Sequence, residues 1–211
     1  MRLLIIPGLY GSEPAHWQSW LQARHPTSVR VNVLDWSVGQ VDVWAERIAA
    51  TLIAEAPGPW LAVAHSFGCL ALARYAALGG RDIDAGLLVA PANPHRFNLA
   101  PAHIARPLPF RSSLVVSDND HWMAREDALA LGAQWGSRPV CIGPAGHINV
   151  DAGFGPWPLA QALVDELRDA DRHAAAGVRA RTTGARNAAP ATRYTALQIA
   201  TPAAAAQTAS A

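Results

Sequence analysis

Ser66 lies in a sequence pattern that is typical of a nucleophilic serine on a tight turn. It is the centre of Ala64-His65-Ser66-Phe67-Gly68, which matches G-x-S-x-G in four of five positions, with Ala64 replacing the first glycine. An apolar run precedes this segment and an Ala/Leu-rich run follows it, so the turn is expected to join a strand to a helix. Such a turn exposes the hydroxyl, and the helix N-terminus offers a backbone N–H to a developing oxyanion. The alternative is an ordinary serine N-cap of the helix.

Two histidines are candidates for a general base that would activate Ser66. His147 follows Gly146 in a loop after the last apolar run, which is the position of the base in the chain order Ser, Asp, His. His65 adjoins Ser66, but neighbouring side chains of an extended segment point to opposite faces. We therefore predict that His147 is the base and that His65 is a buried packing residue.

The carboxylate that would orient His147 is expected in the segment Ser-Asp-Asn-Asp-His-Trp at residues 117–122. Asp118 and Asp120 are two residues apart, so periodicity alone does not choose between them. The turn-forming Asp-Asn-Asp ends the strand near Ser117, and Asp120 lies farther out, toward the last loop. We predict Asp120 as the partner and keep Asp118 as the alternative. The pattern Asp-x-Asp-His is also typical of metal ligands, but no further cluster of ligand residues accompanies it. Neither a metal nor another cofactor is therefore predicted.

The first apolar run is followed by a glycine-bearing turn, Pro-Gly-Leu-Tyr-Gly-Ser at residues 7–12. The backbone N–H of Leu9 is expected to complete, with that of Phe67, a site that binds an oxyanion. A phosphate-binding glycine loop is the alternative, but the G-x-G-x-x-G spacing is absent. Most of the aromatic residues nearby are expected in the core, and the candidates for lining a substrate groove are Tyr10, Trp17 and Trp36.

The elements that must position these residues alternate between two kinds of run. Short apolar runs, typical of strands buried on both faces, occupy residues 3–6, 29–34, 60–64, 85–90, 114–116 and 140–142. Amphipathic or Ala/Leu-rich runs, typical of helices, occupy residues 13–23, 41–55, 67–78, 125–135 and 158–168. Six such units predict an α/β fold with a doubly wound, mostly or wholly parallel six-stranded sheet. The proline-rich segment 91–109 is expected to form a short lid or rim, so no large cap domain is predicted.

Composition divides the 211 residues into two parts. Residues 1–170 are predicted to form one domain, and the Ala-, Arg- and Thr-rich residues 171–211 a mobile C-terminal extension that holds few large apolar side chains. The net charge of +1 gives no strong field for nucleic acid, and the chain has no lysine, which excludes Schiff-base chemistry. Two cysteines are too few for a disulfide scaffold. The initial apolar run is too short for a signal peptide or a membrane span, so a cytoplasmic protein is predicted.

Several of these strings together resemble one family. The turn at residues 7–12, His16-Trp-Gln-Ser-Trp20, His65-Ser-Phe-Gly68 and Gly146-His-Ile-Asn149 are similar to the small serine hydrolases related to retinoblastoma-binding protein 9 and bacterial YdeN. The resemblance covers about residues 1–170. It implies a compact α/β hydrolase without a large cap and a triad of Ser66, Asp120 and His147.

Two functions are compatible with these observations. The first is an esterase-type serine hydrolase that cleaves a small or medium acyl ester through an acyl-enzyme. The second is a protein-interaction module on a hydrolase scaffold, with weak or no turnover. An intact triad favours the first. A small-molecule ester is the expected partner; neither nucleic acid nor a membrane is expected, and the sequence indicates no particular protein partner.

Overall fold

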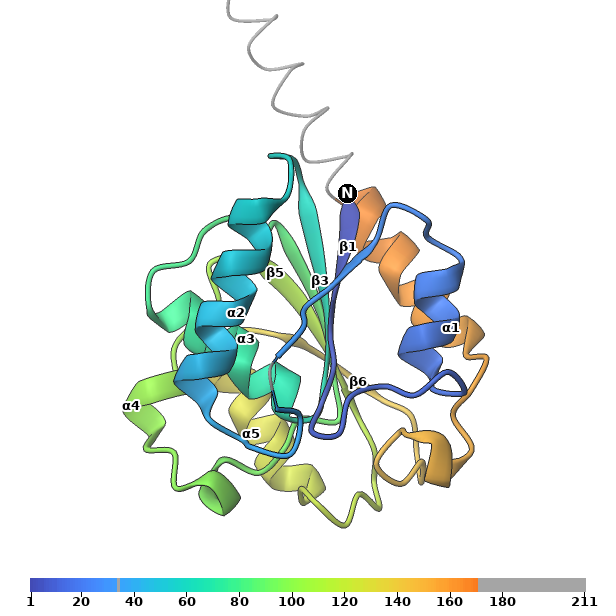
Figure 1. Cartoon of the computed structure of the whole chain (residues 1–211). Coiled ribbons are helices and arrows are strands. Elements are labelled where there is room, and N and C mark those ends of the chain that lie inside the picture. The colour runs from blue at the N-terminus through green and yellow to red at the C-terminus, as the bar shows by residue number, and fades with distance from the viewer. Residues whose placement is uncertain (34, 171–211) are drawn as a thin grey trace, which may run out of the picture. The chain divides into compact units, whose positions relative to one another are not determined.

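The alternating runs fold into a single parallel sheet covered by helices on both faces (Figure 1). The computed structural model describes residues 1–33 and 35–170. The strands are β1 (Arg2–Ile6), β2 (Val29–Arg30), β3 (Trp60–His65), β4 (Ala85–Val89), β5 (Arg111–Val116) and β6 (Arg138–Cys141). Their order across the sheet is β2-β1-β3-β4-β5-β6, and every neighbouring pair is parallel, which confirms the predicted fold class. The predicted extension 171–211 lies outside the described residues.

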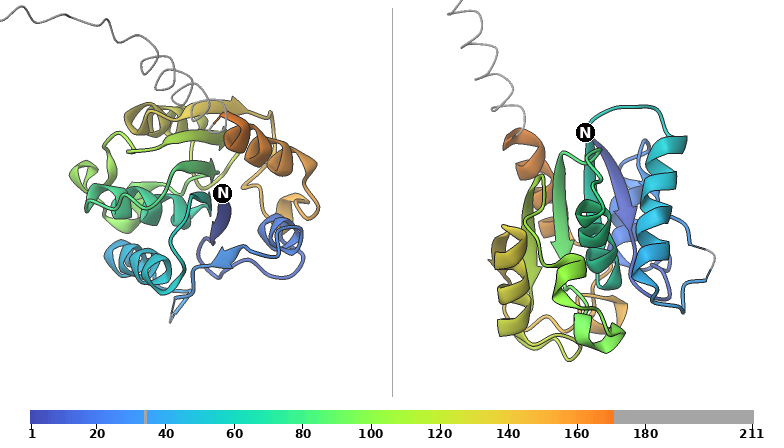
Figure 2. Two further views of the ribbon diagram at one scale, coloured as in Figure 1. Left: turned by 90° about the horizontal axis from the view of Figure 1, so that it is seen from above. Right: turned by 90° about the vertical axis from the view of Figure 1, so that its left-hand side faces the viewer.

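Helices cover the two faces of the sheet unequally (Figure 2). The helical elements are α1 (Trp17–Ala23), α2 (Val41–Ala54), α3 (Phe67–Ala77), η1 (Pro94–Phe97), α4 (Pro101–Ile104), α5 (Arg125–Trp135), η2 (Val150–Ala152) and an unlabelled helix at residues 158–170. The first face carries α2, α3 and α5, and the second carries α1 and the helix at 158–170. Within the described ranges, no helix is both long and apolar enough to cross a membrane.

Strand β1 shows how the sheet divides the core. Its side chains alternate, so that Leu4 and Ile6 contact the first face while Leu3 and Ile5 contact the second. All four side chains are fully buried. Burial on both faces explains why the strands are continuous apolar runs rather than alternating ones.

Three elements differ from their predicted bounds by three residues or more at one end, and most of the others differ by one or two residues. Strand β2 is only two residues long, because it lies at the edge of the sheet and pairs with β1 alone. Strand β5 begins three residues earlier than predicted, since the polar side chain of Ser112 is buried against Ser137 with a hydroxyl–hydroxyl distance of 2.6 Å. Helix α1 begins at Trp17, because the imidazole Nδ1 of His16 accepts the Gln18 N–H and caps the helix there.

The chain reverses its direction of strand addition between β1 and β3, which are neighbours in the sheet. In open parallel sheets, ligands bind beside the carboxyl ends of strands at such a point. Gly68, at the start of α3, lets that helix approach the end of β1: a Cβ on Gly68 would lie 2.5 Å from the Ile6 carbonyl oxygen and closer still to that of Pro7. The turns after β1 and β3 are therefore held against each other.

The substitution Gly68→Ala is expected to destabilise the protein by about 1–3 kcal/mol, because the added methyl group forces α3 away from β1. The sign is informative, since the same change inside an unobstructed helix stabilises by roughly 0.5–1 kcal/mol. Denaturant unfolding measures the change. Gly58→Ala is the control, because a Cβ at Gly58 would meet no atom within 4 Å. An unchanged or higher unfolding midpoint for Gly68→Ala would contradict the close approach.

Candidate active site

Ser66 occupies a strained turn between β3 and α3. Its φ of 53° and ψ of −121° lie in a region that non-glycine residues rarely adopt. The turn is held by the Ser66 N–H, which donates to the Val89 carbonyl oxygen of β4 at 3.1 Å. The side chain of Ser66 makes no capping hydrogen bond to α3, so the hydroxyl is available for another partner.

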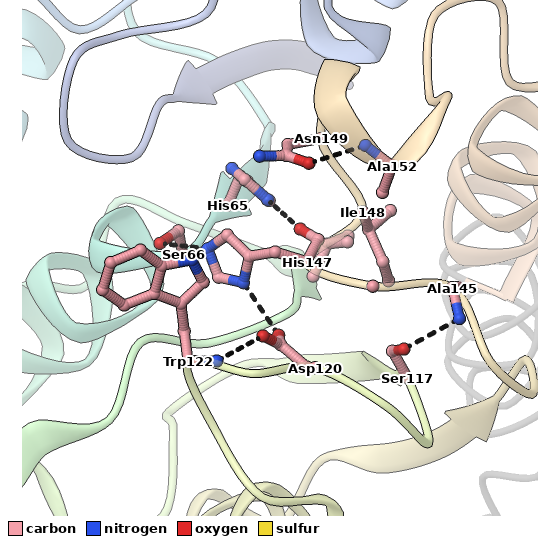
Figure 3. A network of polar contacts seen from close by, with 12 residues as sticks. His65, Ser66, Ser117, Asp120, Trp122, Ala145, His147, Ile148, Asn149 and Ala152 are labelled. Carbon is pink, nitrogen blue, oxygen red and sulfur yellow. Dashed lines mark hydrogen bonds and ion pairs between the residues drawn. The ribbon is translucent and has the colours of Figure 1, made fainter.

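That partner is His147, which lies in the loop after β6 (Figure 3). The Ser66 Oγ lies 2.8 Å from His147 Nε2, and His147 Nδ1 lies 2.8 Å from Asp120 Oδ2. The second Asp120 oxygen accepts the Trp122 backbone N–H at 2.9 Å. The side chains of His147 and Asp120 are 8 % and 4 % exposed. The structure thus joins a hydroxyl, an imidazole and a carboxylate in one hydrogen-bonded line.

Asp118 points to a different partner. Its carboxylate pairs with the Arg125 guanidinium at 2.8 Å, and its side chain is almost half exposed. The alternative carboxylate considered from the sequence is therefore not in contact with His147. The two aspartates separate because a turn, rather than an extended strand, runs through Asn119.

Four hydrogen bonds from distant segments hold the backbone of residues 145–148, around His147. Two polar side chains that follow β5 accept backbone N–H groups of this segment: Ser117 Oγ accepts that of Ala145 at 3.0 Å, and Asn119 Oδ1 accepts that of Gly146 at 2.7 Å. Two buried donors bind its carbonyls: His65 Nε2 donates to that of His147 at 3.0 Å, and Trp17 Nε1 to that of Ile148 at 2.9 Å. The imidazole of His147 is therefore positioned from both sides. Sequence reasoning missed Ser117 and Asn119 as positioning residues, although both stand beside the predicted acid.

His65 is buried, as predicted, and forms part of a row of three imidazoles. Its ring centroid lies 5.0 Å from that of His16 and 5.1 Å from that of His147. Burial, together with the neighbouring His147 and His16, holds the pKa of His65 well below its ordinary value. Burial also lowers the pKa of His16 from 6.5 to about 4, with smaller contributions from Arg30 and His147. The imidazoles of His16 and His65 are therefore neutral near pH 7 and act as hydrogen-bonding groups.

The lowered pKa of His16 predicts that acid weakens the fold. Between pH 6.5 and about 4 the unfolded chain holds a proton on His16 that the folded chain does not, so the free energy of unfolding falls as the pH falls. The slope approaches about 1.4 kcal/mol per pH unit for this group. His16→Asn retains an acceptor for the Gln18 N–H but cannot be protonated, so its unfolding free energy should fall less steeply in denaturant titrations over this range. Equal slopes for the two proteins would contradict the prediction.

The backbone N–H groups of Leu9 and Phe67 lie on the two turns that meet at Ser66. Phe67 follows Ser66 directly, and Leu9 follows Gly8, where a Cβ would lie 2.8 Å from the Ser66 Cβ. In the part of the chain that the structure describes, neither N–H donates to a protein acceptor. The next N–H along, that of Tyr10, is bound to the Trp36 carbonyl oxygen at 2.9 Å, and Tyr10 has a positive φ of 64°. The backbone N–H groups of Leu9 and Phe67 are therefore available to a ligand.

The three aromatic candidates for a groove have different surroundings. Tyr10 is 79 % exposed, and Trp36 is partly buried and packs edge-on against Trp44 with a centroid distance of 5.4 Å. Trp17 is completely buried, and its indole N–H is bound to Ile148. The expectation that Trp17 lines a groove is therefore wrong: it is a core residue that supports the His147 loop.

One aromatic residue at the site was not selected from the sequence. Trp122 is 46 % exposed, and its ring centroid lies 6.3 Å from that of His147 (Figure 3). The signal was present, because Trp122 is two residues after the predicted acid. No periodicity marks such a side chain as facing the site, since it lies in a turn.

The predicted rim at residues 91–109 contains η1 and α4. The Phe97 ring of η1 packs on the Phe67 ring at 4.6 Å, which places η1 over the N-terminus of α3. A small cavity of about 170 Å³ lies between the rim and α5. Among residues 1–33 and 35–170, no group of three or more His, Cys, Asp or Glu side chains is arranged to hold a metal ion.

The fold is that of an α/β hydrolase. The family model described as "Serine hydrolase" matches residues 3–166, so the chain belongs to the serine hydrolase family, as the sequence strings indicated. A YdeN-like hydrolase from Pectobacterium atrosepticum is 33 % identical, with a TM-score of 0.76 over 80 % of this chain and 90 % of its own.

More distant structures share the fold. The ydeN gene product of Bacillus subtilis is 18 % identical, with a TM-score of 0.66 over 80 % of this chain and 98 % of its own. Est1E from Butyrivibrio proteoclasticus, solved with ferulic acid bound, is 15 % identical, with a TM-score of 0.57 over 71 % of this chain and 82 % of its own. None of the curated proteins compared matches the sequence.

Proposed function

We propose that this protein is a carboxylesterase-like serine hydrolase in which Ser66, His147 and Asp120 form the catalytic triad. The observation that carries the proposal is the continuous line of two 2.8 Å contacts from Ser66 Oγ through the His147 ring to Asp120. Serine is a weak nucleophile unless an adjacent base accepts its proton, and the base must be held in the correct tautomer. This line meets both requirements in a site where the imidazole and the carboxylate are almost fully buried.

In the first half of the reaction, Ser66 Oγ attacks the ester carbonyl carbon while His147 Nε2 takes the hydroxyl proton. Asp120 accepts the Nδ1–H and stabilises the imidazolium. The N–H groups of Leu9 and Phe67 donate to the oxyanion of the tetrahedral intermediate. The intermediate collapses, the C–O bond to the alcohol breaks, and His147 returns the proton to the leaving oxygen. In the second half, water attacks the acyl-enzyme with the same proton transfers, which releases the acid.

The expected substrates are esters with small or medium acyl groups. The rim of the site consists of the short elements η1 and α4 rather than a cap domain, and exposed aromatic side chains such as Tyr10 and Trp122 border it. These features favour short esters over long triglycerides as substrates.

Labelling with a fluorophosphonate probe, followed by peptide mapping, tests the proposal directly. We expect a single labelled residue, Ser66, and hydrolysis of esters in a panel of increasing acyl length. A protein that is neither labelled nor active on any ester would instead support the interaction-module alternative.

A further inference from the structure

Arg96 is placed at the mouth of the site by its contact with Trp122. Its guanidinium carbon lies 4.5 Å from the centre of the Trp122 ring, and that ring faces His147 at 6.3 Å. The next residue, Phe97, anchors η1 on Phe67. Trp122 is itself fixed, because its backbone N–H is bound to Asp120. The Trp122 ring therefore lies between Arg96 and the His147 imidazole.

The guanidinium of Arg96 has no acidic partner within residues 1–33 and 35–170. The two aspartates of the adjacent turn are engaged, Asp120 with His147 and Asp118 with Arg125. Asp127 lines the cavity between the rim and α5 and forms no ion pair with Arg96. The positive charge at the site mouth is thus uncompensated.

The sequence around Arg96 reinforces this charge. No Asp or Glu occurs between Asp84 and Asp118, a stretch that includes the whole rim and contains Arg96, Arg106, Arg111 and two histidines. Residues 1–170 as a whole carry a net charge of −3, so the rim is a local exception. An arginine stacked on an indole keeps its N–H edge available and loses little further rotamer freedom when it binds a carboxylate with two parallel hydrogen bonds.

We propose that the substrate carries a carboxylate, or a similar anionic group, outside the scissile ester, and that Arg96 binds this group from its position on Trp122. This inference rests on the proposed esterase function and specifies its substrate class. The anionic group lies on either the acyl or the alcohol side of the ester, and the two arms of the experiment distinguish these.

The experiment compares matched esters that differ in charge but hardly in shape. For the alcohol side the pair is 4-acetoxybenzoate and 4-acetoxybenzamide, and for the acyl side it is monomethyl adipate and the corresponding adipamide methyl ester. We expect the wild-type protein to prefer the anionic member of at least one pair in kcat/KM. Arg96→Gln should reduce that preference by about tenfold, chiefly through KM, and higher ionic strength should reduce it in the wild-type protein. Arg106→Gln, which removes an exposed charge from the same rim, should leave the preference unchanged.

Each outcome either supports or overturns the inference. A preference for neutral esters in both pairs, or a preference that Arg96→Gln leaves intact, overturns it while the esterase proposal stands. If the protein is labelled at Ser66 but turns over none of the four esters, protection of Ser66 from the probe replaces turnover as the readout, and equal protection by the charged and neutral compounds overturns the inference. Absence of both labelling and hydrolysis overturns the proposed function and this inference together.

Discussion

Replacing Ser66 by alanine is expected to lower kcat for ester hydrolysis by on the order of 10⁴-fold to 10⁶-fold while the protein stays folded. The Ser66 hydroxyl lies 2.8 Å from His147 Nε2, and alanine offers no atom to attack a carbonyl. What remains is binding and oxyanion stabilisation. Initial rates on the best ester of the panel, together with fluorophosphonate labelling, measure the loss.

Two controls separate this result from damage to the fold. Ser28→Ala removes a hydroxyl that makes only a 3.4 Å contact to the Gln22 carbonyl oxygen, and it should retain activity. Ser66→Gly should be as inactive as Ser66→Ala but more stable by about 1 kcal/mol, because glycine adopts the positive φ of this turn without strain. Probe labelling that persists in Ser66→Ala would exclude Ser66 as the nucleophile.

Asp120→Asn is expected to reduce kcat by on the order of 10⁴-fold. The amide keeps the shape of the carboxylate, but it presents either an N–H or a neutral oxygen to His147 Nδ1. The imidazole is then held in the wrong tautomer, and the imidazolium loses its counter-charge. Steady-state kinetics at pH 7 to 8 measure the effect, and thermal unfolding checks the fold.

Asp118→Asn is the matched control, because the same chemical change is made two residues away. It weakens an exposed pair with Arg125, and such pairs contribute only about 0–1 kcal/mol to stability. We expect nearly full activity. If Asp118→Asn were the crippling variant and Asp120→Asn the mild one, the assignment of the acid would have to be reversed.

Local patterns were sufficient for the fold class and for the neighbourhood of the site. Continuous apolar runs indicate strands that are buried on both faces. Parallel strands bring the turns at their carboxyl ends to one edge of the sheet. Ser66, Asp120 and His147 were therefore expected near one another from their positions after β3, β5 and β6. Gly68 was also recognisable as the last position of the G-x-S-x-G pattern, although the carbonyl groups that exclude a larger residue there belong to the end of β1.

Other features depended on contacts between segments far apart in the chain. Trp17 was expected at a groove, yet its indole N–H binds Ile148, more than a hundred residues later, and this contact buries it. The role of His65 in fixing the His147 carbonyl is of the same kind. The local sequence around an aromatic or imidazole side chain is the same whether its polar atom forms a hydrogen bond to a distant backbone group or to solvent.

The sequence by itself determined that a serine turn and a histidine loop preceded by glycine would each follow a strand of one parallel sheet, because hydrophobic periodicity and turn chemistry are properties of short segments. Only the tertiary structure decided which aspartate meets the imidazole and which pairs with Arg125. It also decided that the Trp122 ring lies near His147 and that Arg96 lies over that ring. The physical reason is that side-chain direction in a turn is set by backbone angles and by the partners that close around it, and neither is encoded by a repeating pattern.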